Sequence, residues 1–199
     1  LKKYNSIVFS IKKDLFRQLY VDVKNLLDAC MASSLKRVYF FNKSHLPSFI
    51  IHINDLVEEK NGNIDDFLED DILTATFQVK EKDLNVFKRK ILKDEYKSLS
   101  FFSWGIYEGI ATFEVSLNIA TKGHALKYLA KIFDIPEENT IAFGDAENDL
   151  SMLNDANEGV FMCNSKDSVI HLGKHFTYKT SDEDGVVDYL EKMHPELWK

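Results

Sequence analysis

The residues best suited to chemistry form the hexapeptide Gly-Asp-Ala-Glu-Asn-Asp at 144–149, directly after the apolar run at 140–143. So short an apolar run predicts a buried strand, and ligands of open α/β sheets gather outside the carboxyl ends of their strands. Asp145, Asn148 and Asp149 would therefore stand beside a ligand site. Carboxylate oxygens suit Mg²⁺, which keeps several waters and takes further oxygens from a phosphate. The motif favours such a site over the simpler alternative of an acidic helix N-cap.

A lysine stands upstream of this motif, at the start of a predicted helix. Thr121 is a suitable N-cap, and apolar residues then recur at helical spacing up to Phe133. Lys122 would lie in the first turn, where free backbone N–H groups and the helix dipole already favour an anion. A lysine in that position could neutralise a phosphate. Considered alone, Lys122 would more simply be a solvated surface charge.

Four segments together resemble a known family. The hexapeptide after a strand is similar to the last metal-binding motif of the haloacid dehalogenase-like (HAD) phosphatases, and residues 113–123 resemble the segment that carries their phosphate-binding lysine. Residues 160–165 resemble the family's Val-x-Met-Gly-Asn-Ala strand and turn, and residues 180–186 resemble the entry to its last helix. Their order and spacing resemble the Cof-type branch, whose members carry a large α/β cap and mostly hydrolyse sugar phosphates and related phosphomonoesters.

The resemblance implies roles for individual residues. Lys122 and Asp149 would be catalytic, and Lys122, Asn148 and Asn164 would bind the substrate. Asp145 and Asp149 would hold Mg²⁺, Asp149 either through water or by orienting Asp145 and Lys122. The partner would be a small phosphorylated substrate, such as a sugar phosphate. In the resembled mechanism an aspartate attacks phosphorus, and water then hydrolyses the aspartyl-phosphate.

The sequence departs from the family at the nucleophile. Members of the resembled family share a hydrophobic strand near the N-terminus that ends in Asp-x-Asp-Gly-Thr. No such motif follows a buried strand in these 199 residues. The segment at 7–14 has strand-like residues but carries Ser10 and Lys12 in place of the two aspartates. Residues 182–186 have a similar sequence, Asp-Glu-Asp-Gly-Val, but they do not follow a buried strand. Capping a terminal helix is the simpler role for Asp182 and Asp184. The chain thus resembles a fragment that would show no turnover by itself; the alternative is a pseudoenzyme that binds a phosphorylated ligand or a protein partner.

Composition limits the other classes of function. Hydrophobic residues make up 45% and charged residues 29% of the chain, and the net charge is −7. This acidity argues against a nucleic-acid surface and against an anionic membrane surface. P-type ATPases carry a similar acidic motif but need membrane helices, and no apolar run here approaches ~20 residues. Two cysteines without metal-ligand spacing, Cys30 and Cys163, favour a reducing cytoplasm; because Cys163 replaces the family's glycine, its role and that of Asn164 stay open.

The predicted fold is α/β with two parts. Residues 1–118 would form an α/β cap domain with a largely antiparallel sheet. A helix over 15–33 would lie near the start of this domain. Residues 119–199 would form the C-terminal half of a doubly wound, HAD-like (Rossmannoid) parallel core. An acidic run at 65–71 lacks the loop spacing of an EF-hand and predicts a solvated helix end. A half-sheet could expose an apolar edge, so the oligomeric state stays open.

Overall fold

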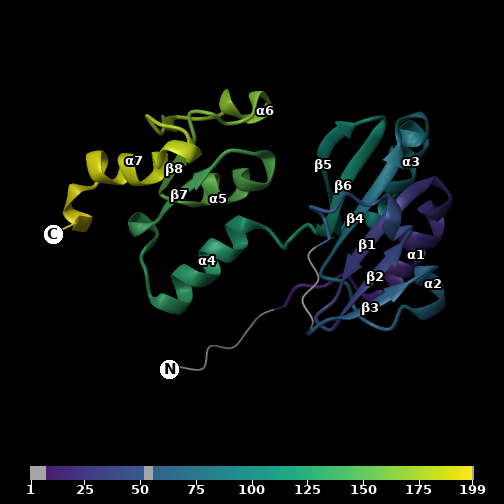
Figure 1. Cartoon of the computed structure of the whole chain (residues 1–199). Coiled ribbons are helices and arrows are strands. Elements are labelled where there is room, and N and C mark those ends of the chain that lie inside the picture. The colour runs from purple at the N-terminus through teal and green to yellow at the C-terminus, as the bar shows by residue number, and fades with distance from the viewer. Residues whose placement is uncertain (1–7, 52–55, 199) are drawn as a thin grey trace. The chain divides into compact units, whose positions relative to one another are not determined.

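The chain folds as two compact units, and it passes from the first to the second between Ile119 and Ala120 (Figure 1). The computed structural model describes residues 8–51 and 56–198. Each unit has its own sheet, six-stranded in the first and three-stranded in the second. Among these described residues, no helix is both long and apolar enough to cross a bilayer.

The first unit is built on a sheet of strand order β3-β2-β1-β4-β6-β5. Only the β2–β3 pair is parallel; the other four pairs are antiparallel. The strands are β1 (Leu27–Ser33), β2 (Arg37–Phe41), β3 (Glu58–Asn61), β4 (Thr74–Lys80), β5 (Leu99–Tyr107) and β6 (Ile110–Leu117). The helices are α1 (Lys13–Val23), α2 (Ile64–Phe67) and α3 (Leu84–Ile91), with 3₁₀ turns η1 (Lys24–Leu26), η2 (Lys43–His45), η3 (Glu81–Asp83) and η4 (Asp94–Tyr96).

The helices of this unit cover one face of its sheet (Figure 1). Alternate residues of the central strands point to that face because successive side chains of a strand point to opposite sides. Phe77 of β4 is fully buried there, with its ring centroid 6.1 Å from that of Phe16 on α1 and 6.3 Å from that of Phe87 on α3. A smaller cluster around Phe40 and Leu46 packs separately. The first unit therefore has an aromatic core of its own.

The helix expected over 15–33 is wrong in its second half. The helix α1 ends at Val23, and Leu27–Ser33 forms a central strand of the sheet. Cys30 pairs with Phe77 on one side and with Phe41 on the other. These pairings are made with residues distant in sequence, so they override the local helical spacing, as tertiary context commonly does.

The segment that contains Ser10 and Lys12 belongs to the first unit. Ile11 is buried and bridges to Ile72, and the ammonium of Lys12 lies 2.8 Å from the carboxylate of Asp71. Residues 8–10 form no strand, and Ile7 lies outside the described residues. Ser10 and Lys12 are therefore parts of the unit that holds the antiparallel sheet, whereas Asp145 belongs to the second unit.

The second unit is a parallel sheet of order β7-β8-β9 with helices on both faces. Ala142 and Phe161 pack against Leu153 on one face, and Phe143 meets Tyr189 edge-on across the other at 5.6 Å. The strands are β7 (Ile141–Gly144), β8 (Glu158–Phe161) and β9 (His175–Phe176). The helices are α4 (Lys122–Phe133), α5 (Leu150–Asp155), α6 (Asp167–Ile170) and α7 (Gly185–Met193), with 3₁₀ turns η5 (Glu137–Asn139), η6 (Glu147–Asp149), η7 (Ser181–Glu183) and η8 (Pro195–Trp198). This arrangement is the doubly wound pattern.

Candidate phosphate and metal site

A cavity of about 420 Å³ opens in the second unit. Its polar lining comes from the first residue of α4, the turn after β7 and the loop before α7. These residues are Lys122, Asp145, Asp149, Ser181 and Asp184. Because β7, β8 and β9 are parallel, the loops that follow them leave the same edge of the sheet, which is where ligands of open α/β sheets bind.

Lys122 and Asp149 form an ion pair in this cavity. Thr121 caps α4 by accepting a hydrogen bond from the backbone N–H of His124 at 3.2 Å, so Lys122 is the first helical residue. Its ammonium donates to Oδ1 of Asp149. The Lys122 side chain stays 49% exposed, whereas that of Asp149 is only 6% exposed. The lysine therefore retains access to the cavity while a buried carboxylate holds its position.

Asp149 is held by the backbone of its own turn as well. Its Oδ2 accepts hydrogen bonds from the N–H groups of Asp145 at 3.0 Å and of Ala146 at 3.2 Å. Burial by itself would raise the pKa of Asp149, but the hydrogen bonds from Lys122 and from these N–H groups outweigh it and lower the pKa below its usual value. Asp149 is therefore an ionised residue that fixes both Lys122 and the turn at 145–146.

The carboxylate of Asp145 differs from that of Asp149 in its exposure and contacts. The residue is exposed and lines the cavity, and its carboxylate makes no hydrogen bond or ion pair with any residue in the described part of the chain. Within residues 8–51 and 56–198, no three His, Cys, Asp or Glu side chains form a group that could hold a metal. One free carboxylate fits Mg²⁺ all the same, since this ion is commonly bound by one or two carboxylates together with waters and phosphate oxygens.

A family model of haloacid dehalogenase-like hydrolases matches residues 3–190. The chain belongs to this family. It is 27% identical over 188 residues to the Bacillus subtilis protein named 5-amino-6-(5-phospho-D-ribitylamino)uracil phosphatase YitU, over 92% of this chain and 67% of that protein. It is 43% identical over 81 residues to phosphatase YwpJ of Bacillus subtilis, over 41% of this chain and 28% of that protein.

Solved structures of HAD-like proteins share the fold. TM0651 from Thermotoga maritima superposes with a TM-score of 0.72 at 19% identity, over 92% of this chain and 67% of that one. The HAD subclass IIB sugar phosphatase BT4131 superposes with a TM-score of 0.70 at 20% identity, again over 92% of this chain and 67% of that one. The chain thus spans about two thirds of these structures, and 28% to 67% of the two relatives named above.

Two other predicted residues of this HAD-like chain, Asn148 and Asn164, are not among the residues that line the cavity. Asn148 is exposed. Glu147, from the same motif, has partners of its own: its carboxylate accepts a hydrogen bond from the hydroxyl of Ser168 and lies 3.8 Å from the ammonium of Lys166. Asn164 reaches the site indirectly, because its amide donates to the hydroxyl of Ser181 at 3.4 Å.

Sequence reasoning missed Ser181 and Asp184. It assigned Asp184 a capping role and gave Ser181 no role, yet both line the cavity. The signal was present in the chain order: residues 175–176 form the third parallel strand, so the loop that follows it leaves the same sheet edge as the loop after β7. Applying the strand-end rule to every predicted strand would have found them.

The depressed pKa of Asp149 predicts a pH dependence of stability. Its ionised form stabilises the fold fully above the unfolded-state pKa of about 3.9, and this contribution is lost as the pH falls through the lower folded-state value. Urea unfolding of the wild type and of Asp149→Asn, followed from neutral pH to about pH 2.5, should show a flatter decline in the variant's free energy of unfolding. Equal declines in the two proteins would contradict the assigned role of Asp149.

Gly144 must stay a glycine for this site to form. A Cβ at Gly144 would lie 2.4 Å from Cβ of Asp149, closer than real side chains approach. Gly144→Ala should push Asp149 away, lower the free energy of unfolding by about 1–3 kcal/mol and weaken phosphate binding in an NMR titration. Gly109→Ala is the control: it strains a positive φ of 74° in the first unit with nothing within 4 Å of the new Cβ, and should leave phosphate binding unchanged. Unaltered phosphate binding by Gly144→Ala would be the contrary result.

Proposed function

We propose that the protein takes part in the Mg²⁺-dependent hydrolysis of a small phosphomonoester, a sugar phosphate or a related compound. One observation carries the proposal: Lys122, which is half-exposed, and Asp145, whose carboxylate has no partner among the described residues, line the same cavity at the carboxyl edge of a parallel sheet. The pairing suits a phosphate and the divalent cation that accompanies it. The two relatives described above are both named phosphatases, which supports the same class of reaction.

Each residue would have a distinct part in binding the phosphate. Lys122 would neutralise a phosphoryl oxygen from the N-terminus of α4, where the backbone N–H groups add to the attraction. Asp145 would hold Mg²⁺ directly, and Asp149 would contact it through water while orienting Lys122 and the turn at Asp145. Asn148 would reach the substrate from the rim of the cavity. Mg²⁺, when bound, supplies charge stabilisation for the phosphoryl group.

The attacking carboxylate would not come from these 199 residues. The sequence contains no Asp-x-Asp-Gly-Thr motif after a buried strand, so we propose that these 199 residues supply the phosphate- and metal-binding half of a site that reacts through an aspartyl-phosphate. Residues 1–118 would act as the cap and residues 119–199 as half of the catalytic core. We accordingly expect the chain to bind phosphate and to hydrolyse a generic phosphomonoester no faster than background.

The test is whether Mg²⁺ and phosphate bind together. Thermal unfolding of the chain should show a larger rise in the midpoint with both ligands than the sum of the rises with each alone, because ligands of the folded state raise its stability and a shared site couples them. Asp134→Asn is the control. It removes a carboxylate at the end of α4, and asparagine readily adopts the left-handed backbone conformation of this position, so the variant should behave as the wild type. Simple addition of the two rises, or no rise at all, would contradict the proposal.

A further inference from the structure

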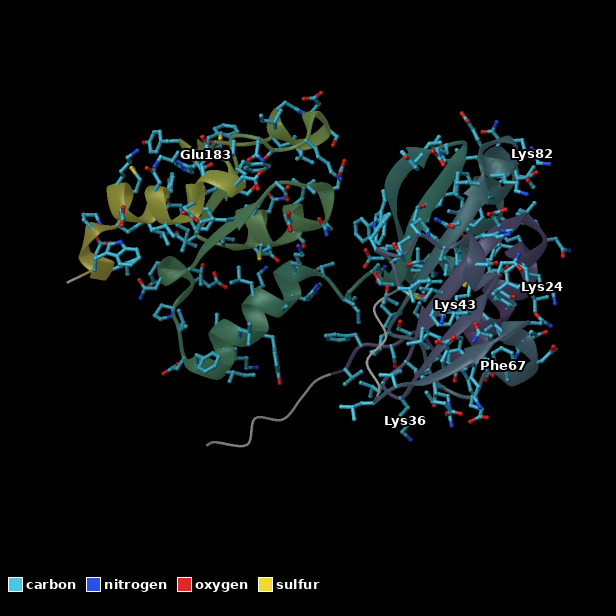
Figure 2. All side chains as sticks on the ribbon, viewed as in Figure 1. Lys24, Lys36, Lys43, Phe67, Lys82 and Glu183 are labelled. Carbon is cyan, nitrogen blue, oxygen red and sulfur yellow. The ribbon has the colours of Figure 1, made fainter. Side chains whose placement is uncertain are left out.

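The loop that precedes α7 is fixed by its own hydrogen bonds. The carboxylate of Glu183 accepts hydrogen bonds from the backbone N–H of Thr180 at 3.2 Å and from its hydroxyl at 2.9 Å. The N–H of Gly185 donates to the carbonyl of Thr180 at 2.9 Å. Figure 2 shows Glu183 in this loop, at the entry to the helix. Ser181 lies between these anchors and forms part of the cavity wall.

The turn after β8 is tied to the same loop. The N–H of Cys163 donates to the hydroxyl of Thr177 at 3.0 Å, and this hydroxyl donates to the carbonyl of Lys179 at 2.7 Å. The next residue, Asn164, donates from its amide to the hydroxyl oxygen of Ser181 at 3.4 Å. The two segments are therefore connected twice, and the position of the Ser181 hydroxyl is set from outside its own loop.

The Ser181 hydroxyl is left with a proton to donate. A serine hydroxyl offers one donor and two acceptor lone pairs, and Asn164 uses a lone pair. Throughout the described part of the chain, no acceptor receives the Ser181 proton. The same cavity is also lined by Lys122 and Asp145. A neutral donor in one cavity with a lysine suits a phosphoryl oxygen, because a phosphate offers several strong acceptors.

We propose that Ser181 donates a hydrogen bond to a phosphoryl oxygen of the ligand and that Asn164 is its positioning residue. This rests on the proposed function, since it concerns the same cavity. It assigns a binding contact to a loop that the sequence indicated only as a helix cap. It also places Asn164 one step from the ligand, acting through the Ser181 hydroxyl rather than on the phosphate itself.

The test compares variants by NMR titration with inorganic phosphate in the presence of Mg²⁺. Ser181→Ala should weaken phosphate binding at least ~10-fold, the effect of losing a hydrogen bond to a charged group, and Ser181→Thr, which keeps the hydroxyl, should restore it. Asn164→Ala should weaken binding too, and the double variant should bind no more weakly than Ser181→Ala, because the two residues act in series. The unfolding midpoint without phosphate should stay unchanged in all of them. Ser44→Ala, which removes an exposed hydroxyl from the first unit, is the control and should bind as the wild type.

The outcomes separate this inference from the proposed function. Wild-type affinity in Ser181→Ala, or full additivity of the Ser181 and Asn164 effects, would overturn the role of Ser181. If Lys122→Ala weakens binding at the same time, the proposed function stands without it. A wild-type chain that binds no phosphate would overturn both.

Discussion

Replacing Lys122 with alanine is expected to weaken the binding of inorganic phosphate at least ~10-fold, since hydrogen bonds to charged groups contribute about 1.5–3 kcal/mol. Two effects act in the same direction. The variant loses the cation that would contact the phosphate, and the buried carboxylate of Asp149 loses its ion-pair partner. That uncompensated carboxylate would repel an incoming anion. An NMR titration with phosphate at neutral pH measures the change.

Lys127→Ala is the matched control for this prediction. Lys127 lies on the same helix, its side chain is 53% exposed against 49% for Lys122, and it pairs with Asp155 at 2.7 Å. Each variant removes one ammonium and breaks one ion pair, so the net charge changes equally. If Lys127→Ala lost as much phosphate affinity as Lys122→Ala, the effect would be general electrostatics and the site would not lie at the start of α4.

Replacing Asp145 with asparagine is expected to remove the dependence of phosphate binding on Mg²⁺. Its carboxylate has no partner among the described residues, so the substitution should leave the free energy of unfolding within about 0.5 kcal/mol of the wild type. Mg²⁺ affinity, measured by calorimetry, should fall more than about 100-fold, because even residues that only orient metal ligands typically change affinity 10- to 100-fold. Phosphate binding without Mg²⁺ should persist, because Lys122 and Asp149 are untouched.

Glu147→Gln separates Asp145 from the general acidity of its motif. Glu147 lies two residues further along the chain, but its carboxylate is engaged by Ser168 and Lys166. The variant should retain the Mg²⁺ affinity of the wild type. Equal losses in Asp145→Asn and Glu147→Gln would indicate that the cation is attracted by net negative charge rather than bound by one carboxylate.

The parts of the site that depend on local chemistry could be predicted from the sequence. An N-cap threonine followed by apolar residues at helical spacing predicts α4, and the structure begins this helix at Lys122 with Thr121 as its cap. An apolar run followed by a glycine and a carboxylate predicts the turn after β7. The structure adds the reason for the glycine, namely that Asp149 packs directly against Gly144.

The parts that depend on distant pairing could not be predicted in this way. Leu27–Ser33 carries residues compatible with a helix, and it is a strand because β2 and β4 pair with it on both sides. Ser181 is one exposed serine among polar residues, and only the parallel sheet brings its loop to the edge where Asp145 lies. In both cases the deciding contacts join residues far apart in sequence, which local spacing does not encode.

Paramagnetic NMR with Mn²⁺ in place of Mg²⁺ tests the central claim most directly. A bound Mn²⁺ broadens the resonances of nearby nuclei, so it reports where the cation binds. We predict selective broadening at Gly144, Asp145 and Lys122, abolished by Asp145→Asn and accompanied by broadening of added phosphate. Broadening centred instead on the acidic run at 65–71, where Asp65 and Asp71 already form ion pairs with Arg17 and Lys12, or none that depends on Asp145, would contradict the claim.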